Sequence, residues 1–441
     1  MRRLLQAIAF VATMACAGYA TSTTTVPATV ARVDSAVAVA TFDSAWSRIA
    51  TTYYDSAMRG IDWAAVRTEL RPRAASAPTT AELRSVLAAM IERLGESHFA
   101  IIPAERASAI DRSPDRADGE AGIELRLIDG RLRVFRVDTG GPAWNAGVRP
   151  GWELRSVDGA SADSLLGAVT LALEQNPPLL PFIAVRAADA RLAGSAGTRL
   201  RAEFRDGTGA MRVVHIVRAP ARGLAVSFGL LPTVVSRVES HRVQRGDGCV
   251  GVVRFNGWMA PIAAAIDSAI VGQSECAGVV LDLRGNPGGL AAMVMGVAGH
   301  FLTAPDSLGT MRMRTATVHL VANPRYGANG SPNAGRLAIL VDELSASTSE
   351  IFAAALQRLG RARVFGSKTP GFALPALIAR LPNGDLLMHV VADFTLPGGG
   401  RVEATGVVPD VEARLTLESL LSGRDLALES AVDWVAGGSR K

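Results

Sequence analysis

Apolar positions in the first quarter of the chain follow a helical period. Between Thr41 and Leu94 they recur every three or four residues, the spacing of amphipathic helices that share a core. Thr79 stands where an N-cap would start the last of these helices. The pattern predicts a small helical bundle that ends at Gly95, within a domain over residues 36–105.

The pattern changes after a polar loop over residues 105–118. Short alternating stretches such as 132–137 follow, and glycines separate them. Alternation of apolar and polar positions indicates strands that are buried on one face. Residues 119–220 are therefore expected to form a compact β-rich domain around one short helix.

Beyond Pro220, strand-like runs alternate with helical ones, which predicts a mixed sheet covered by helices. We expect strands over 250–255, 278–283, 337–341, 363–365 and 386–392, and helices over 260–271, 290–302 and 349–359. Residues 225–441 would form this domain. The predicted fold class is a multidomain α+β and α/β protein: helical bundle, β-rich domain and sheet-and-helix core.

The first residues have the features of a secretory signal peptide over residues 1–20. Arg2 and Arg3 precede an apolar run that ends near Cys16, and small residues follow. Cleavage would follow Ala17 or Ala20; the alternative is a lipoprotein, anchored to a membrane through Cys16. Either reading predicts an exported protein that is periplasmic, held in the cell envelope or secreted.

The charges are scattered rather than clustered. The chain has 46 Lys and Arg against 41 Asp and Glu, a net charge of +5, and no run of five or six like charges. A nucleic-acid surface would need a basic stripe, so nucleic acid is not an expected partner. Nearly all the basic residues are arginines, since Lys368 and Lys441 are the only lysines.

Two cysteines remain in the predicted mature chain, Cys249 and Cys276. Each precedes an apolar run, and if these runs are adjacent parallel strands the two residues could form a disulfide. The alternative is two buried thiols. The sequence has no HExxH motif and no paired Cys and His spacing, so we expect no metal and no cofactor.

Three segments of the last domain could carry chemistry. In residues 280–289 a buried strand runs into a Gly-rich turn, and in 337–352 a strand passes through Ser345-Ala346-Ser347 into a helix. The third, 401–410, is a polar turn. Taken singly, these are a tight turn, a helix cap and a loop; a serine at a strand-to-helix turn is also well placed to be a nucleophile.

Their order resembles a known family. LDLRGNPGG, then SASTSEIFAAALQRLGRARVFG, then VEATGVVPDVE are similar to the C-terminal-processing (tail-specific) and tricorn-core serine peptidases. The resemblance implies a ClpP/crotonase-like core that cleaves proteins or peptides, with Ser347 as nucleophile. Gly288 or Gly289, together with the N–H of Thr348, would form the oxyanion hole.

The stretch GPAWNAGVRPGWELRSVDG resembles a PDZ domain. That resemblance implies a groove which captures the C-terminus of a peptide by strand addition. The carboxylate would be received by N–H groups near four residues at the start of the domain: Gly122, Ile123, Glu124 and Leu125.

The sequence departs from the tail-specific branch at the catalytic base. That branch uses a lysine in a T-x-G-K segment, and here Phe372 follows Thr369-Pro370-Gly371. The tricorn-like branch uses a histidine preceded by a serine and supported by a late glutamate. Its pattern implies His98 as base, with Ser97 and Glu403 in support.

Other readings stay open from the sequence. His98 could be a loop histidine at a helix end, and Lys368 could serve as the base. The protein could be a catalytically silent envelope scaffold that binds peptide C-termini, or a hydrolase of small esters or lipids. The resemblance to a peptidase favours hydrolysis of polypeptides.

Overall fold

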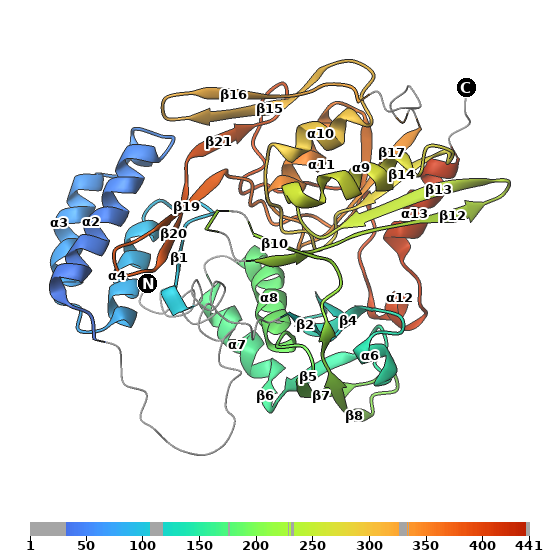
Figure 1. Cartoon of the computed structure of the whole chain (residues 1–441), viewed down its shortest axis with the longest axis horizontal. Coiled ribbons are helices and arrows are strands. Elements are labelled where there is room, and N and C mark those ends of the chain that lie inside the picture. Colours follow the sequence, from blue (N-terminus) through green and yellow to red (C-terminus); the bar gives the residue numbers. More distant parts are fainter. Residues whose placement is uncertain are drawn as a thin grey trace. The chain divides into compact units, whose positions relative to one another are not determined.

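The computed structural model describes residues 32–105, 118–174, 177–227, 229–230, 233–325, 333 and 335–437. The predicted signal peptide and Cys16 lie outside the described residues. The chain divides into two compact units, Met1–Ala221 with Leu377–Val390, and Arg222–Ala376 with Val391–Lys441 (Figure 1). Within the described ranges, no helix combines the length and the apolar character needed to cross a membrane.

The first unit begins with the predicted helical bundle. Its helices are α2 (Ser35–Thr52), α3 (Trp63–Ala75) and α4 (Thr80–Glu92), with a 3-10 turn η1 (Met58–Gly60) before α3. Thr79 caps α4, since its side chain accepts a hydrogen bond from the N–H of Glu82. The helices pack through apolar side chains with no exposed surface, among them Phe42, Ile49, Leu70, Leu83 and Leu87.

A short sheet follows α4. Strand β1 (Ala100–Ile102) pairs antiparallel with β20 (Leu386–Val390), and β20 lies beside β19 (Ala376–Arg380). The single strand predicted over 386–392 is therefore two strands, β20 and β21 (Ala392–Thr395), which belong to different units. The break falls at Val391, whose N–H donates to the carbonyl of Pro375 instead of continuing the β20 ladder.

Residues 119–220 form a β-rich region in which the structure describes three α-helices rather than the one short helix that was expected. Its antiparallel sheet has the order β3-β4-β5-β7-β8, with β6 beside β5. The strands are β3 (Ile123–Ile128), β4 (Arg131–Val137), β5 (Glu153–Val157), β6 (Ala160–Ser161), β7 (Arg199–Arg205) and β8 (Met211–Val217), and β2 (Gly119–Glu120) pairs with β9 (Ala219–Pro220). Its helical segments are α6 (Pro142–Asn145), α7 (Ala162–Ala172), η2 (Pro177–Leu179) and α8 (Leu180–Leu192). That this is a PDZ domain stays a prediction.

The second unit is built on a six-stranded sheet of order β12-β13-β14-β17-β18-β22. Its strands are β12 (Val238–Arg245), β13 (Gly248–Phe255), β14 (Gly278–Asp282), β17 (Arg336–Val341), β18 (Ala362–Gly366) and β22 (Val411–Glu412). All neighbours are parallel except the β12–β13 hairpin. Smaller sheets pair β10 (Leu224–Val226) with β11 (Val234–Ser236), and β15 (Asp306–Met313) with β16 (Thr317–Ala322) and β21.

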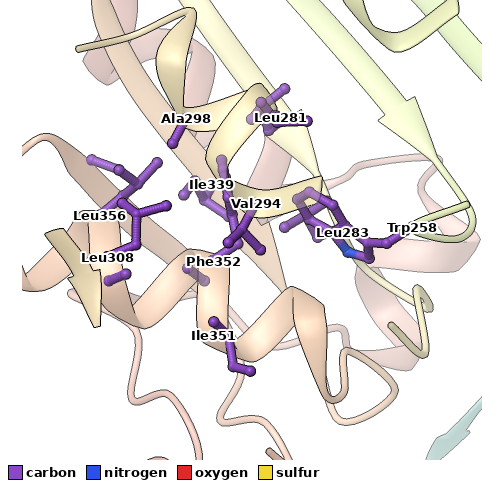
Figure 2. Packing of buried hydrophobic residues seen from close by; sticks show 14 of the residues in the cluster. Trp258, Leu281, Leu283, Val294, Ala298, Leu308, Ile339, Ile351, Phe352 and Leu356 are labelled. Carbon is purple, nitrogen blue, oxygen red and sulfur yellow. The ribbon is translucent and has the colours of Figure 1, made fainter. Parts of the chain in front are cut away.

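Helices cover both faces of this sheet. Alternate side chains of one strand reach opposite faces: Ile339 packs with α9 (Ala263–Val271), α10 (Met293–Gly299) and α11 (Thr348–Arg358), as Figure 2 shows around Phe352 and Val294. Leu340 packs on the other face against α13 (Leu426–Ala436). The remaining helical segments are η3 (Ala260–Ile262) and α12 (Leu417–Leu421). The predicted layered α/β core is confirmed.

A disulfide joins Cys249 and Cys276, whose Cα atoms are 4.7 Å apart. Cys249 lies at the start of β13, and Cys276 stands just before β14, the parallel neighbour of β13. Of the two alternatives that the sequence left open, the structure has the bridge.

Candidate active site

Ser347 stands at the turn between β17 and α11. Its backbone has φ 56° and ψ −119°, a region that costs a residue with a side chain of order 1–3 kcal/mol. The residues on either side, Ala346 and Thr348, are buried, whereas Ser347 is partly exposed. This strained turn therefore presents the Ser347 side chain from an otherwise buried segment.

A Gly-rich turn after β14 packs directly against Ser347. A Cβ atom added to Gly288, which has φ 101°, would lie 2.6 Å from the Cβ of Ser347 and 3.0 Å from the nitrogen of Thr348. The Thr348 hydroxyl donates to the carbonyl of Gly289 at 2.8 Å. The structure thus brings together the four residues predicted to form the nucleophile and the oxyanion hole: Ser347, Gly288, Gly289 and Thr348.

The two glycines differ in the use of their N–H groups. The N–H of Gly288 donates to Oδ1 of Asn286 at 3.0 Å. Within the described part of the chain, no hydrogen bond is donated by the N–H of Gly289 or of Thr348. Free backbone donors beside a nucleophile are what a developing oxyanion requires, so Gly289 is the better candidate of the pair.

Glu350 organises this site, and its importance was missed in the sequence. Oε2 accepts from the N–H groups of Ser347 (3.0 Å) and Phe372 (2.8 Å), and Oε1 accepts from the N–H of Gly371 (2.8 Å) and the hydroxyl of Thr369. Burial raises the pKa of Glu350 to about 7, against these four hydrogen bonds, which favour the carboxylate. The Ser-x-x-Glu spacing of a capping box was the signal for this contact.

Glu403 also contacts the loop over residues 369–373, to which Glu350 is hydrogen-bonded. Its Oε2 accepts from the N–H of Ala373 at 2.8 Å, and the N–H of Ala404 donates to the carbonyl of Gly371 at 2.9 Å. The loop over residues 369–373 therefore connects Glu403 to Glu350 and, through it, to Ser347.

Phe372 occupies the position where the tail-specific pattern has its lysine. Its carbonyl accepts from the N–H of Ser347 at 2.6 Å, so the main chain at this position is next to the predicted nucleophile. Lys368 is exposed, while the side chain of its neighbour Thr369 is buried against Glu350.

A buried ion-pair network supports the Gly-rich turn. The guanidinium of Arg284 lies between the carboxylates of Asp282 and Asp425, with N–O distances of 2.8–2.9 Å. Burial opposes the ionised form of Asp282, but the charge and hydrogen bonds of Arg284 lower its pKa to about 2. The network ties the end of β14 to the start of α13.

Ser97 and His98 lie together in the first unit, in the turn between α4 and β1. Oγ of Ser97 is 2.7 Å from Nδ1 of His98, and His98 has a positive φ of 59°. Burial lowers the pKa of His98 to about 4, which keeps the imidazole neutral near pH 7. A neutral imidazole of this kind can act as a base, because it can still take up a proton.

The predicted peptide-binding residues stand at the start of β3. This strand pairs with β4 alone among the described strands, so it is an edge strand, and α8 packs beside it. An edge strand next to a helix is the arrangement that strand addition uses. Gly122, with φ 71°, precedes Ile123, Glu124 and Leu125 there.

Comparisons with known proteins agree with this architecture. Residues 249–413 match peptidase family S41, and residues 40–92 match the tricorn protease C1 domain. The chain is 26% identical over 384 residues to the chloroplastic carboxyl-terminal-processing peptidase 3 of Arabidopsis thaliana, covering 84% of this chain and 68% of that one. It is 24% identical to the carboxyl-terminal-processing protease of a Synechocystis species, covering 89% and 86%.

Among solved structures, the photosystem II D1 C-terminal processing protease has the same fold. The two align with a TM-score of 0.58 and 21% identity, covering 91% of this chain and 98% of the other. With the sheet, the helices and the serine turn in place, the family match settles the class of protein. The chain is a serine peptidase whose residues 249–413 match peptidase family S41.

Proposed function

We propose that this peptidase hydrolyses polypeptides through an acyl-enzyme on Ser347, with His98 as general base. The observation that carries the proposal is the turn at Ser347, where a strained and partly exposed serine stands beside the unused N–H groups of Gly289 and Thr348. The exposure of Lys368 and the aromatic at position 372 leave histidine as the favoured base.

In the proposed reaction, Nε2 of His98 takes the proton of Ser347 while Oγ attacks the carbonyl carbon of the scissile bond. The N–H groups of Gly289 and Thr348 stabilise the oxyanion. His98 then gives the proton to the leaving amine, and a water molecule that His98 deprotonates releases the acyl group.

Ser97 and Glu403 have supporting roles in this proposal. For Nε2 to accept a proton, Nδ1 must carry one, and it donates this proton to Oγ of Ser97. That bond fixes the tautomer and orients the ring. We assign to Glu403 the stabilisation of the positive charge that His98 gains.

Substrate selection is proposed to begin at the edge of β3. The N–H groups near Gly122, Ile123, Glu124 and Leu125 would receive the C-terminal carboxylate of a substrate, as the resemblance to PDZ domains implies. Peptides that end in a free carboxylate should then have a lower KM than the same peptides ending in a carboxamide, and deletion of residues 119–220 should remove the difference.

We infer that the protein acts after export, in the periplasm, at the cell envelope or outside the cell. The Cys249–Cys276 disulfide supports this, because such bridges persist in oxidising compartments. Fractionation of cells that express the wild type and a Cys16→Ser variant would separate a lipid anchor from a cleaved signal peptide.

The central test uses a fluorophosphonate serine probe together with a peptide substrate. We expect labelling at Ser347, a kcat lower by about 10⁴-fold in Ser347→Ala and in His98→Gln, and near-normal turnover in Lys368→Arg. Loss of turnover in Lys368→Arg with an active His98→Gln would replace histidine by lysine as the base. Absence of labelling together with absence of turnover would indicate a silent scaffold, and turnover of small esters alone would indicate an esterase.

A further inference from the structure

A buried carboxylate lies two residues before His98. The side chain of Glu96 is 1% exposed. Oε1 accepts from the hydroxyl of Tyr54 at 2.7 Å and from the guanidinium of Arg59 at 2.7 Å, and Oε2 accepts from the hydroxyl of Tyr53. We call these four residues the Glu96 cluster.

The three donors come from one short stretch of chain. Tyr53 and Tyr54 follow the end of α2, and Arg59 lies in η1, where its own φ is 56°. Tyr53 is fully buried and Tyr54 nearly so. The segment that follows α2 therefore supplies three hydrogen-bond donors to a single carboxylate in the turn after α4.

Stability alone does not account for this cluster. Burying a carboxylate is unfavourable unless it is fully paired, and apolar side chains of similar size often stabilise a core at least as well. Buried polar groups with all their bonds made do, however, fix one conformation. The conformation in question is that of the turn over residues 95–98.

That turn needs to be held. Gly95 has φ 61° and His98 has φ 59°, so the backbone is left-handed on both sides of Glu96 and Ser97. A left-handed conformation at a residue with a side chain persists when its surroundings impose it. The Glu96 cluster supplies the constraint before His98.

A second constraint follows His98. The ring of Phe99 packs on that of Tyr53, with centroids 5.9 Å apart, and Ala100 begins β1, which pairs with β20. Tyr53 therefore contacts the turn on both sides of His98, through its hydroxyl to Glu96 and through its ring to Phe99.

We propose that Glu96 is a positioning residue, which acts with Tyr53, Tyr54 and Arg59 to hold the Ser97–His98 turn in the conformation that catalysis requires. The proposal rests on the proposed role of His98 as base. It predicts that weakening the cluster lowers the rate of the chemical step without changing substrate binding.

The test compares three variants with matched polypeptide kinetics. Glu96→Gln keeps the shape of the side chain but removes its charge, and Tyr54→Phe removes one donor. Asp43→Asn is the control, because it removes a carboxylate that binds Arg67 and Arg71 in the same helical bundle but does not touch the turn. We expect kcat to fall at least 10-fold in Glu96→Gln and about 3-fold or more in Tyr54→Phe, with KM changed less than 2-fold and the rate of fluorophosphonate labelling lowered in parallel.

Two further comparisons separate the possible outcomes. If Glu96 acts through His98, adding Glu96→Gln to His98→Gln should cause no further loss. If His98→Gln is inactive but Glu96→Gln and Tyr54→Phe turn over normally, the positioning role is wrong and the proposed function stands. If His98→Gln is active, the proposed function itself fails. Equal losses in Glu96→Gln and Asp43→Asn would show a general effect on the bundle and overturn the inference.

Discussion

Gly288 and Ser347 are in such close contact that no side chain fits between them: a Cβ on Gly288 would lie 2.6 Å from the Cβ of Ser347. The contact places the Gly-rich turn after β14 against the serine turn before α11. Any substitution that enlarges residue 288 must move one of the two.

Gly288→Ala should therefore remove activity and also lower stability. We expect kcat/KM to fall at least 100-fold, because the Ser347 turn is displaced from the N–H groups of Gly289 and Thr348. Gly399→Ala is the matched control, since Gly399 has a similar φ of 95° but an added Cβ would meet nothing within 4 Å. Both variants should lose about 1 kcal/mol to backbone strain, and Gly288→Ala should lose more because its Cβ also clashes with Ser347 and the carbonyl of Ala346; urea unfolding measures both losses. Equal activity of the two variants would refute the argument.

Glu350→Gln should damage both stability and catalysis. An amide NH₂ group cannot accept, so at least one of the N–H groups that now bind Glu350 would be left buried and unsatisfied, at a cost of about 1–3 kcal/mol. We expect kcat to fall about 100-fold as the loop over 369–373 loosens. Glu418→Gln, an exposed glutamate in the first turn of α12, should change neither quantity. A fully active Glu350→Gln variant would show that the hydrogen bonds to this carboxylate are dispensable.

His389 should make the fold sensitive to acid. It is buried, its Nδ1 is 3.1 Å from Oγ1 of Thr52, and burial together with the nearby charge of Arg48 lowers its pKa to about 4, against about 6.5 when unfolded. Between these values the unfolded chain binds a proton that the folded one does not, so stability is complete above pH 6.5 and is lost as the pH falls towards 4.

The measurement compares wild type and His389→Gln at pH 7.5 and pH 4.5. From the two pKa values, the wild type should lose about 2.5 kcal/mol more unfolding free energy than the variant over this interval. Other groups, His98 among them, titrate in both proteins and cancel in the difference. An identical loss in the two proteins would mean that His389 is protonated in the folded state.

Removing the disulfide should lower stability and spare catalysis. The bridge spans 27 residues, for which chain entropy predicts about 3–4 kcal/mol of unfolding free energy. Cys276 precedes β14, whereas the turn with Gly288 follows its other end, so kcat should stay within twofold in Cys249→Ala/Cys276→Ala. Dithiothreitol should lower the Tm of the wild type and leave that of the variant unchanged. A large loss of kcat would mean that the bridge shapes the site.

Local patterns predicted much of this molecule. The helical period over 41–94 gave α2, α3 and α4, and the alternation of strands and helices gave the layered core, because both periods report directly which side chains are buried. The strained serine turn lies at the strand-to-helix junction that the sequence pointed to. The sequence allowed either a disulfide or two buried thiols at Cys249 and Cys276, because the choice depends on whether β13 and β14 are neighbours in the sheet.

Other features depend on contacts between distant parts of the chain. Glu350 is the first-turn acid of a helix in the sequence, and its bonds to Gly371 and Phe372 appear when the loop folds back over it. The donors to Glu96 come from about 40 residues upstream. By contrast, the hydrogen bond from the N–H of Gly288 to Asn286 is local, and it depends on the shape of a single turn that the sequence does not specify.

The β19–β20 hairpin has a consequence for dissecting the protein. Residues 377–390 belong to the first unit although they lie between two segments of the second, so the chain passes between the units three times. A fragment that ends at residue 221 would lack β20. Strand β1, which follows His98 directly in the sequence, would then have lost its pairing partner. Neither unit is encoded by one continuous stretch of the gene. A chimera in which the first unit is exchanged between relatives would therefore have to include this hairpin.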